Sequence, residues 1–263
     1  MEHTTEVFDH ILDSFQPVTL SDMDGVKLMN RVDTKFVLNK SRLAGLLQKA
    51  QANFSILEIE NQRITPYSTL YFDTPDLQMY TMHHNGKRNR YKVRMRVYEN
   101  SQQTFLEVKH KNNKGRTNKK RIEINYNQFE KREFCEANFP FLKQYMPYNP
   151  DLLMPSLQNY FRRITLVDKN KTERITIDIG LKFKSIENDS VAQMEELVII
   201  EIKQDGACKS EFRSILEQNR ILPGSLSKYC LGIALLDERV KRNFFKYKIR
   251  RINKITNRNY VAN

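Results

Sequence analysis

Charged residues recur at every second position along several segments of this chain, with mostly aliphatic residues between them. The sets are Arg31/Asp33/Lys35, Lys92/Arg94/Arg96, Glu107/Lys109/Lys111, Lys119/Arg121/Glu123, Arg174/Thr176/Asp178 and Glu201/Lys203. Because successive side chains of a β-strand point to opposite faces of its sheet, this spacing predicts strands with one ionic and one apolar face. We therefore expect an antiparallel sheet that gathers its charges on one face.

The ionic face could be the solvated side of an open sheet packed on helices, which is a common arrangement. Two features favour a closed sheet instead. Arg, Lys and Glu dominate nearly every set, where solvated faces usually mix Thr, Ser, Gln and Lys. Closure would also remove exposed edge strands and direct the charges into one lumen. We predict an α+β fold, a closed antiparallel β tunnel with flanking helices.

Apolar spacing and turn signals predict the remaining elements. Helices are expected at residues 6–15, 21–29, 41–52, 210–219 and 225–239, and further strands at 67–73, 159–168, 174–179 and 197–203. Asn85-Gly86 predicts a hairpin turn, and residues 126–149 resemble a helical and irregular insertion. Since no repeat or low-complexity linker divides the chain, residues 1–239 are predicted to be a single domain and residues 240–263 a basic tail.

The charge balance predicts an anionic partner. The chain carries 44 Lys and Arg against 31 Asp and Glu, a net charge of +13, which is typical of proteins that bind nucleic acid, phospholipid surfaces or phosphate compounds. The tail has eight of these basic residues and no acid. It suits a helix on a membrane surface or on polyphosphate, and equally a disordered or packed terminus. We expect no specific nucleic acid, because no recognition helix or aromatic RNA-binding strand is evident.

Cysteine spacing and hydropathy indicate the compartment. Cys135, Cys208 and Cys230 are far apart and form no CxxC pair, which argues against a disulfide framework and a zinc site. No window reaches the ~20 apolar residues of a membrane helix. We expect a cytoplasmic protein. Through its tail it could meet a membrane surface or a membrane protein, and so be peripheral at the inner membrane face.

A lumen crowded with cations needs a neutralising partner, because an isolated charge in a low-dielectric interior costs several kcal/mol. A chain of phosphates would supply that partner, since Arg forks and Lys ammonium groups both suit phosphate oxygens. The scattered Glu and Asp would pair internally or provide the oxygen ligands of Mg²⁺ or Mn²⁺. The pattern therefore predicts a metal–polyphosphate ligand.

Nine fragments in a fixed order carry a family resemblance. They read RVDTKF, STLYFDTPD, YKVRMRVY, FLEVKHK, KKRIEI, YFRR, ERITIDIG, VIIEIK and SKYCLG, and cover about residues 25–236. This order resembles the vacuolar transporter chaperone (VTC) domain, a branch of the triphosphate tunnel metalloenzymes. The resemblance implies a polymerase that transfers the γ-phosphate of ATP to a growing inorganic polyphosphate chain inside the tunnel.

The resemblance also implies roles for individual residues. Catalytic positions would be Lys35, Arg94, Arg96, Lys109 and Lys203. Further substrate-binding positions would be Lys119, Arg121, Arg162, Arg174 and Lys228, and Glu201 would ligate Mn²⁺ or Mg²⁺. Hydrolytic relatives carry ExExK on the first strand, where this chain has Arg31, Asp33 and Lys35. This departure favours the polymerase branch.

Two other functions stay open at this point. A metal-dependent triphosphatase of the same fold would release free phosphate instead of lengthening a chain. A polyphosphate-binding module with a degraded site would do neither, although Glu201 together with the basic positions argues against degradation. The pattern further predicts that Val93, Met95, Val108, Ile175 and Ile202 pack outward against helices, and that small anions bind among Arg94, Arg96, Lys109, Arg162 and Lys228.

Overall fold

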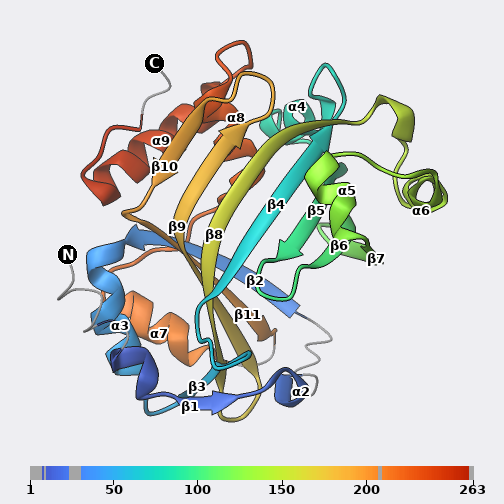
Figure 1. Cartoon of the computed structure of the whole chain (residues 1–263). Coiled ribbons are helices and arrows are strands. Elements are labelled where there is room, and N and C mark those ends of the chain that lie inside the picture. The colour runs from blue at the N-terminus through green and yellow to red at the C-terminus, as the bar shows by residue number, and fades with distance from the viewer. Residues whose placement is uncertain (1–7, 9, 24–30, 207–208, 261–263) are drawn as a thin grey trace.

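A computed structural model describes residues 8, 10–23, 31–206 and 209–260. Within this part, strands and helices mix around one large sheet (Figure 1). The strands are β1 (Gln16–Val18), β2 (Arg31–Asn39), β3 (Phe54–Leu57), β4 (Thr65–Asp73), β5 (Arg90–Tyr98), β6 (Gln103–Lys111), β7 (Thr117–Ile124), β8 (Met154–Asp168), β9 (Glu173–Ser185), β10 (Val191–Met194) and β11 (Leu197–Asp205). The helices are α2 (Leu20–Met23), α3 (Leu43–Ala50), α4 (Gln78–His84), α5 (Tyr126–Lys131), α6 (Phe139–Tyr145), α7 (Glu211–Gln218), α8 (Lys228–Leu236) and α9 (Asn243–Thr256), with 3-10 turns at Lys40–Arg42, Glu136–Asn138 and Pro150–Leu152.

The main sheet is antiparallel along the order β2-β11-β9-β8-β4-β5-β6-β7. Short strands extend it: β10 pairs with β9, and β3 joins β8 to β1. In the described residues β7 and β2, the two ends of this order, do not pair with each other. The prediction of a large antiparallel sheet is confirmed, while the prediction of a closed one needs correction. Closure depends on the curvature of the sheet, which alternation does not encode.

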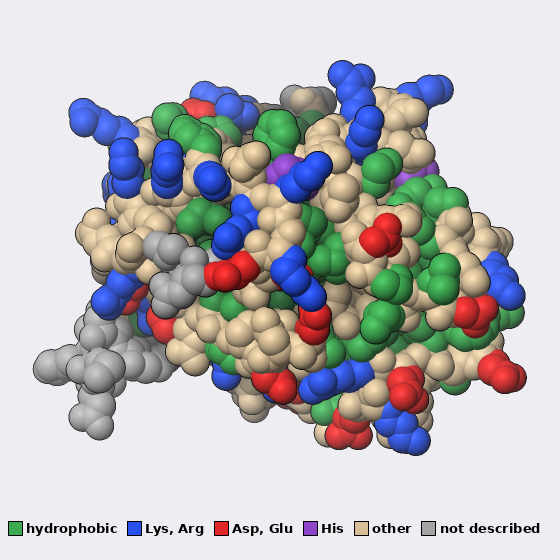
Figure 2. All heavy atoms as spheres, turned by 90° about the horizontal axis from the view of Figure 1, so that it is seen from above, with side chains coloured by type: hydrophobic (Ala, Val, Ile, Leu, Met, Phe, Trp, Pro, Cys, Tyr) green, Lys and Arg blue, Asp and Glu red, His purple; other side chains and the backbone are tan. Residues whose placement is uncertain are grey.

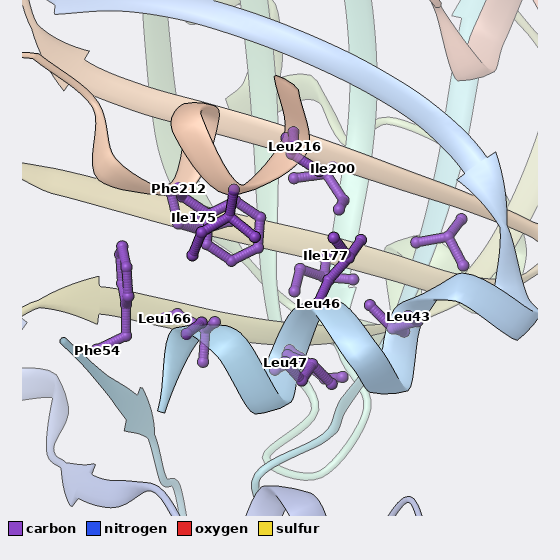
Figure 3. Packing of buried hydrophobic residues seen from close by; sticks show 14 of the residues in the cluster. Leu43, Leu46, Leu47, Phe54, Leu166, Ile175, Ile177, Ile200, Phe212 and Leu216 are labelled. Carbon is purple, nitrogen blue, oxygen red and sulfur yellow. The ribbon is translucent and has the colours of Figure 1, made fainter. Parts of the chain in front are cut away.

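One face of the sheet is apolar and covered by helices. Around β9, β11 and β8, the side chains of α3 and α7 pack against Ile175, Ile177 and Ile200 (Figure 3). Around β5 and β6, buried Val93, Met95 and Val108 pack with residues of α5 and α6. Ile175 and Ile202 are fully buried in the first of these clusters. The five outward-packing residues predicted from alternation are confirmed.

A bulge in β9 divides the inner face into a polar part and an apolar part. The pairing of β9 with β8 shifts by one residue between Ile179 and Lys182, and Gly180 there has φ +61°. Glycine adopts this left-handed conformation without steric cost. The extra residue lets Leu181 and Phe183 face α8, whereas Asp178 pairs with Arg163 and Lys228.

Helix α8 fills the apolar part of the inner face. Its first residue, Lys228, follows Ser227, whose side chain caps the helix by accepting a hydrogen bond from the Cys230 amide at 3.3 Å. Gly232 is required where α8 meets β8, since an added Cβ would lie 2.5 Å from Leu157. The hydroxyl of Tyr229 donates to the buried carboxylate of Asp73 and ties α8 to the end of β4.

The structure corrects one local prediction. Asn85-Gly86 is no hairpin turn, because it ends α4, and Gly86 has the positive φ that favours glycine after a helix. The predicted helix at 21–29 lies partly outside the described residues, and its described part is α2. In the tail, residues 243–256 form α9, which packs Phe245 and Ile252 into the core beside α8. No helix among the described residues is long and apolar enough to cross a membrane.

Candidate active site

A cavity of about 270 Å³ opens where the two ends of the curled sheet face each other. Strands β2 and β11 form one side, β5, β6 and β7 form the other, and residues 224–227 with His83 and α9 border it. Its charged lining is strongly basic: Lys35, Arg90, Lys92, Lys109, Lys111 and Lys248 against Asp33 and Glu201. The sheet therefore brings its charged faces around one space, although β2 and β7 do not pair within the part of the chain that the structure describes.

On the β5–β6 side, the buried carboxylate of Glu107 pairs with two cations. Arg94 approaches one carboxylate oxygen, Oε2, with Nε at 2.7 Å and Nη2 at 2.6 Å, and Lys119 pairs with the other oxygen. Burial opposes ionisation of Glu107, but Arg94, Arg96 and Lys119 outweigh it and hold its pKa below the usual range. Glu107 is therefore a fixed anion that orients Arg94.

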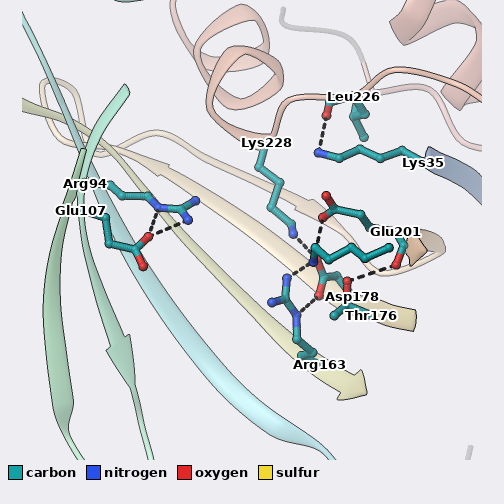
Figure 4. A network of polar contacts seen from close by, with 10 residues as sticks. Lys35, Arg94, Glu107, Arg163, Thr176, Asp178, Glu201, Leu226 and Lys228 are labelled. Atoms are coloured by element: carbon teal, nitrogen blue, oxygen red, sulfur yellow. Dashed lines mark hydrogen bonds and ion pairs between the residues drawn. The ribbon is translucent and has the colours of Figure 1, made fainter. Parts of the chain in front are cut away.

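On the opposite side, Asp178 of β9 holds a second pair of cations (Figure 4). Arg163 of β8 binds it in a fork, with Nε to Oδ1 at 2.6 Å and Nη2 to Oδ2 at 3.0 Å, and Lys228 pairs with Oδ2. The Lys228 ammonium also lies 3.9 Å from the ring centre of Phe161. Although burial opposes ionisation, Arg163 and Lys228 hold the pKa of Asp178 well below its usual range.

The lysines between these two clusters are held close together. Burial, together with the nearby Lys35 and Lys109, lowers the pKa of Lys92 to about 7. Burial and the nearby Lys35 and Arg94 lower the pKa of Lys109 to about 8. Within the described residues neither ammonium has a carboxylate within ion-pair distance. Lys92 donates to Ser227 Oγ at 2.9 Å. Such a group of partly neutralised lysines is suited to an anion that restores their charge.

Glu201 of β11 is the predicted metal ligand. Lys203 lies 3.7 Å from its carboxylate, and Lys203, Lys35 and Lys109 hold its pKa below the usual range against the effect of burial. No group of three or more His, Cys, Asp or Glu in the described part of the chain is placed to hold a metal ion. However, Mg²⁺ commonly takes one or two carboxylates and completes its shell with substrate phosphates and water. Glu201, with Asp33 on the same cavity, fits a metal held in that way.

Most predicted phosphate-binding residues lie on the inner face. Lys35 lies near Glu201 and donates to the Leu226 carbonyl at 3.3 Å, and Arg96 has a buried Nε without a hydrogen-bond partner among the described residues. Burial and Arg94 lower the pKa of Arg96. Lys203 and Arg174 face inward beside Glu201, as the pairing of β9 with β11 requires. Arg121, exposed on β7, lies over the ring of Phe105 at 4.5 Å.

The structure corrects the placement of Arg162. Its side chain is exposed on the outer face, in alternation with the inward-facing Phe161 and Arg163. The adjacent Arg163 occupies the position that the prediction gave to Arg162. The sequence contained the information needed to place Arg162. Ile164 and Leu166 follow it by two and four residues, and both pack in the helix-covered core. Alternation therefore assigns Arg162 to the outer face.

Other residues at the cavity were not among the predicted site residues. Lys92 and Lys111 belong to the alternating sets, so their inward direction was predictable. Ser227 lies in the helix predicted at 225–239, but its contact with Lys92 joins residues 135 positions apart. Arg90, two residues before Lys92 on β5, continues the same alternation, whereas Lys248 lines the cavity because of tertiary packing that no local pattern shows.

The fold and the cavity thus define a curled antiparallel sheet with a polybasic interior. A sequence profile of the VTC domain matches residues 30–237, most of the chain. The chain therefore belongs to the VTC-domain family.

Several solved structures are similar at low identity. A candidate adenylate cyclase from Bacillus halodurans is 13% identical with a TM-score of 0.49, over 76% of this chain and 96% of that one. A candidate adenylyl cyclase from Hippeastrum, described as having a dominant triphosphatase activity, is 13% identical with a TM-score of 0.46, over 76% of this chain and 94% of that one. No curated protein matches the chain.

Proposed function

We propose that this protein is an ATP-dependent polyphosphate polymerase. The observation that carries the proposal is the charge of the cavity, which six Lys and Arg line against two carboxylates. An extended polyanion neutralises such an excess, and linear polyphosphate is narrow enough to lie between two strand walls. Membership of the VTC-domain family supports a phosphate-related function.

The cations of the site would have two different roles, depending on whether a carboxylate already pairs with them. Arg94 and Arg163 are already oriented by Glu107 and Asp178, so they would place a phosphate group in a defined position. Arg96 and Lys109 lack such a carboxylate partner in the described residues, and Lys35 contacts only a carbonyl there. These three would supply most of the attraction for phosphate. Further phosphates of the polyphosphate chain would be bound by Lys119, Arg121, Arg174, Lys203 and Lys228.

The reaction needs no protein nucleophile. An oxygen of the terminal phosphate of the acceptor chain attacks the γ-phosphorus of ATP, and the bond from that phosphorus to the β-phosphate oxygen breaks. ADP leaves with the electron pair, and the chain is longer by one phosphate. Glu201, with Asp33, would hold Mn²⁺ or Mg²⁺, which would supply charge neutralisation between the two polyanions. The protein's own contribution is to align donor and acceptor and to stabilise the spread charge with fixed cations.

The sequence at the start of β2 favours transfer over hydrolysis. A triphosphatase with ExExK on this strand would present two carboxylates to the cavity, whereas the chain has Arg31 and Asp33 there. Fewer carboxylates leave less capacity to hold the metal ions and the water of a hydrolytic reaction. The cavity is correspondingly better suited to a second phosphate chain as the attacking group.

The test is incubation of the purified protein with ATP and Mn²⁺, followed by gel separation of polyphosphate and separate measurement of ADP and free phosphate. We expect a ladder of lengthening chains and ADP, with little free phosphate. The double variant Arg94→Glu/Arg96→Glu should make none. ADP with an equal amount of free phosphate and no ladder would identify a triphosphatase. Binding of polyphosphate without turnover of ATP would identify a binding module.

A further inference from the structure

Helix α9 is amphipathic, and one of its faces is unoccupied within the described residues. Phe245, Ile252 and Thr256 are buried against the domain. The opposite face presents Phe244 and Tyr247, which are 67% and 73% exposed. Leu222, 65% exposed, lies next to this face, because Arg251 donates to its carbonyl at 3.3 Å. Large apolar side chains with this degree of exposure gather here, where burying them would normally be favoured.

The same face is strongly basic. Lys246, Arg250, Arg251 and Lys254 lie on α9, and the helix contains no acidic residue. In a helix, positions three and four apart share a face, so Tyr247 lies between cations and one turn from Phe244. Figure 2 looks down on the end of the molecule where α9 lies in Figure 1, and it shows basic side chains gathered along one margin.

From these contacts we propose that α9 docks the protein on an anionic phospholipid surface. Aromatic side chains that flank lysines and arginines are typical of helices lying in a membrane interface, where the rings enter the headgroup boundary and the cations meet lipid phosphates. A soluble polyanion such as RNA or free polyphosphate would account for the cations. It would not account for exposed Phe244 and Leu222, which a hydrated polyanion leaves in water.

Docking through this face would place the membrane beside the cavity. Lys248 of the same helix donates to Ser225 Oγ at 3.1 Å, and both residues line the cavity. The inward face of α9 therefore belongs to the border of the candidate active site, while its outward face would rest on lipid. The proposal does not depend on the polymerase activity, because lipid binding is measured without ATP.

The experiment is cosedimentation of the full chain with vesicles of phosphatidylcholine alone and of phosphatidylcholine mixed with phosphatidylserine. We expect binding to the mixed vesicles only. Phe244→Ser/Tyr247→Ser should weaken it at least about tenfold, because the rings no longer enter the interface. Lys246→Ala/Arg250→Ala should weaken it about 25-fold, since each cation near an anionic surface is worth about fivefold.

Matched controls lie elsewhere on the surface. Leu152 and Met154 are 54% and 53% exposed, and Lys131 and Lys143 are exposed on α5 and α6. Leu152→Ser/Met154→Ser and Lys131→Ala/Lys143→Ala should bind the mixed vesicles like the parent. The proposal is overturned if the parent shows no preference for phosphatidylserine, or if the aromatic double variant binds unchanged. If instead soluble polyphosphate or RNA binds through the α9 cations and vesicles do not, the surface serves a soluble polyanion.

Discussion

Two adjacent arginines on β8 should respond in opposite ways to substitution. Arg163→Ala removes the fork from Asp178, whose side chain is 5% exposed, while Arg162→Ala removes an exposed side chain on the outer face. Both changes delete the same atoms one position apart. Any difference between the two variants therefore reports which face of the strand matters.

The magnitude follows from the contacts. Removing one partner of a buried ion pair costs about 3–5 kcal/mol of folding free energy, and Lys228 still pairs with Asp178, so we expect about 3 kcal/mol for Arg163→Ala. At about 2–4 °C per kcal/mol for a domain of similar size, the melting temperature should fall by about 6–12 °C. Arg162→Ala should change the free energy of unfolding by less than about 0.5 kcal/mol.

Thermal unfolding followed by circular dichroism, together with ATP turnover well below the melting temperature, tests both parts. Turnover of Arg163→Ala should fall about 10²–10³-fold, the usual effect of losing one electrostatic contact to the reacting phosphate. Arg163→Lys should recover only part of the activity, because an ammonium cannot form the fork. Arg162→Ala should remain within twofold of the parent. Equal losses in the Ala variants, or a larger loss in Arg162→Ala, would refute the assignment of faces.

Three further outcomes are expected. Glu201→Gln should lower turnover by about 10²–10³-fold and leave polyphosphate affinity nearly unchanged, because the amide keeps the shape of the side chain but loses the charge that would hold the metal. If the variant instead turns over at the parent rate with saturating ATP and Mn²⁺, another carboxylate holds the metal. Reversal of both Arg94 and Arg96 to Glu should abolish phosphate binding in metal-free calorimetry, and binding that survives would contradict the cluster. Since the pKa values of Lys92 and Lys109 are lowered to about 7 and 8 in the free protein, a bound polyanion should raise them. Binding near pH 8 should then take up protons and weaken toward pH 9, which calorimetry in buffers of different ionisation enthalpy would detect; no proton uptake would exclude these lysines from the contact.

Features set by residues close together in the sequence were predicted well, whereas features set by residues far apart in the sequence were not. Alternation is a local property, and it correctly assigned Val93, Met95 and Ile175 to the helix-covered face. Alternation was not applied to Arg162. The family resemblance assigned phosphate binding to Arg162, whereas alternation with Ile164 places Arg162 on the outer face and Arg163 on the inner one. Asn85-Gly86 was ambiguous because a hairpin turn and a helix end both favour a residue with positive φ.

Closure and the far side of the cavity lay beyond local patterns. Whether β7 meets β2 depends on the twist and bulges summed over eight strands, and the Gly180 bulge cannot be located from alternation alone. The contacts of Lys92 with Ser227 and of Lys248 with Ser225 exist because α8 and α9 pack across the inner face. Such contacts follow from the whole fold, so the site was predicted as strands together with Lys228 of the helix at 225–239, while residues 224–227 and α9 were found at its border in the structure.

The open sheet and the distribution of charge fit together. A hydrogen-bonded barrel would restrict the lumen on all sides, whereas here residues 224–227 and α9 border the cavity, and Lys35, Lys92 and Lys248 donate to this segment. Arg94 and Arg163 are already paired with buried carboxylates, so a phosphate gains less from them than from cations that have no carboxylate within ion-pair distance among the described residues. Arg96, Lys109 and Lys35 are such cations, so they would attract a polyanion most strongly, and the paired arginines would fix the position of the reacting phosphate. Binding strength and positioning are thus assigned to different residues, and substitutions in the two groups should separate affinity from turnover.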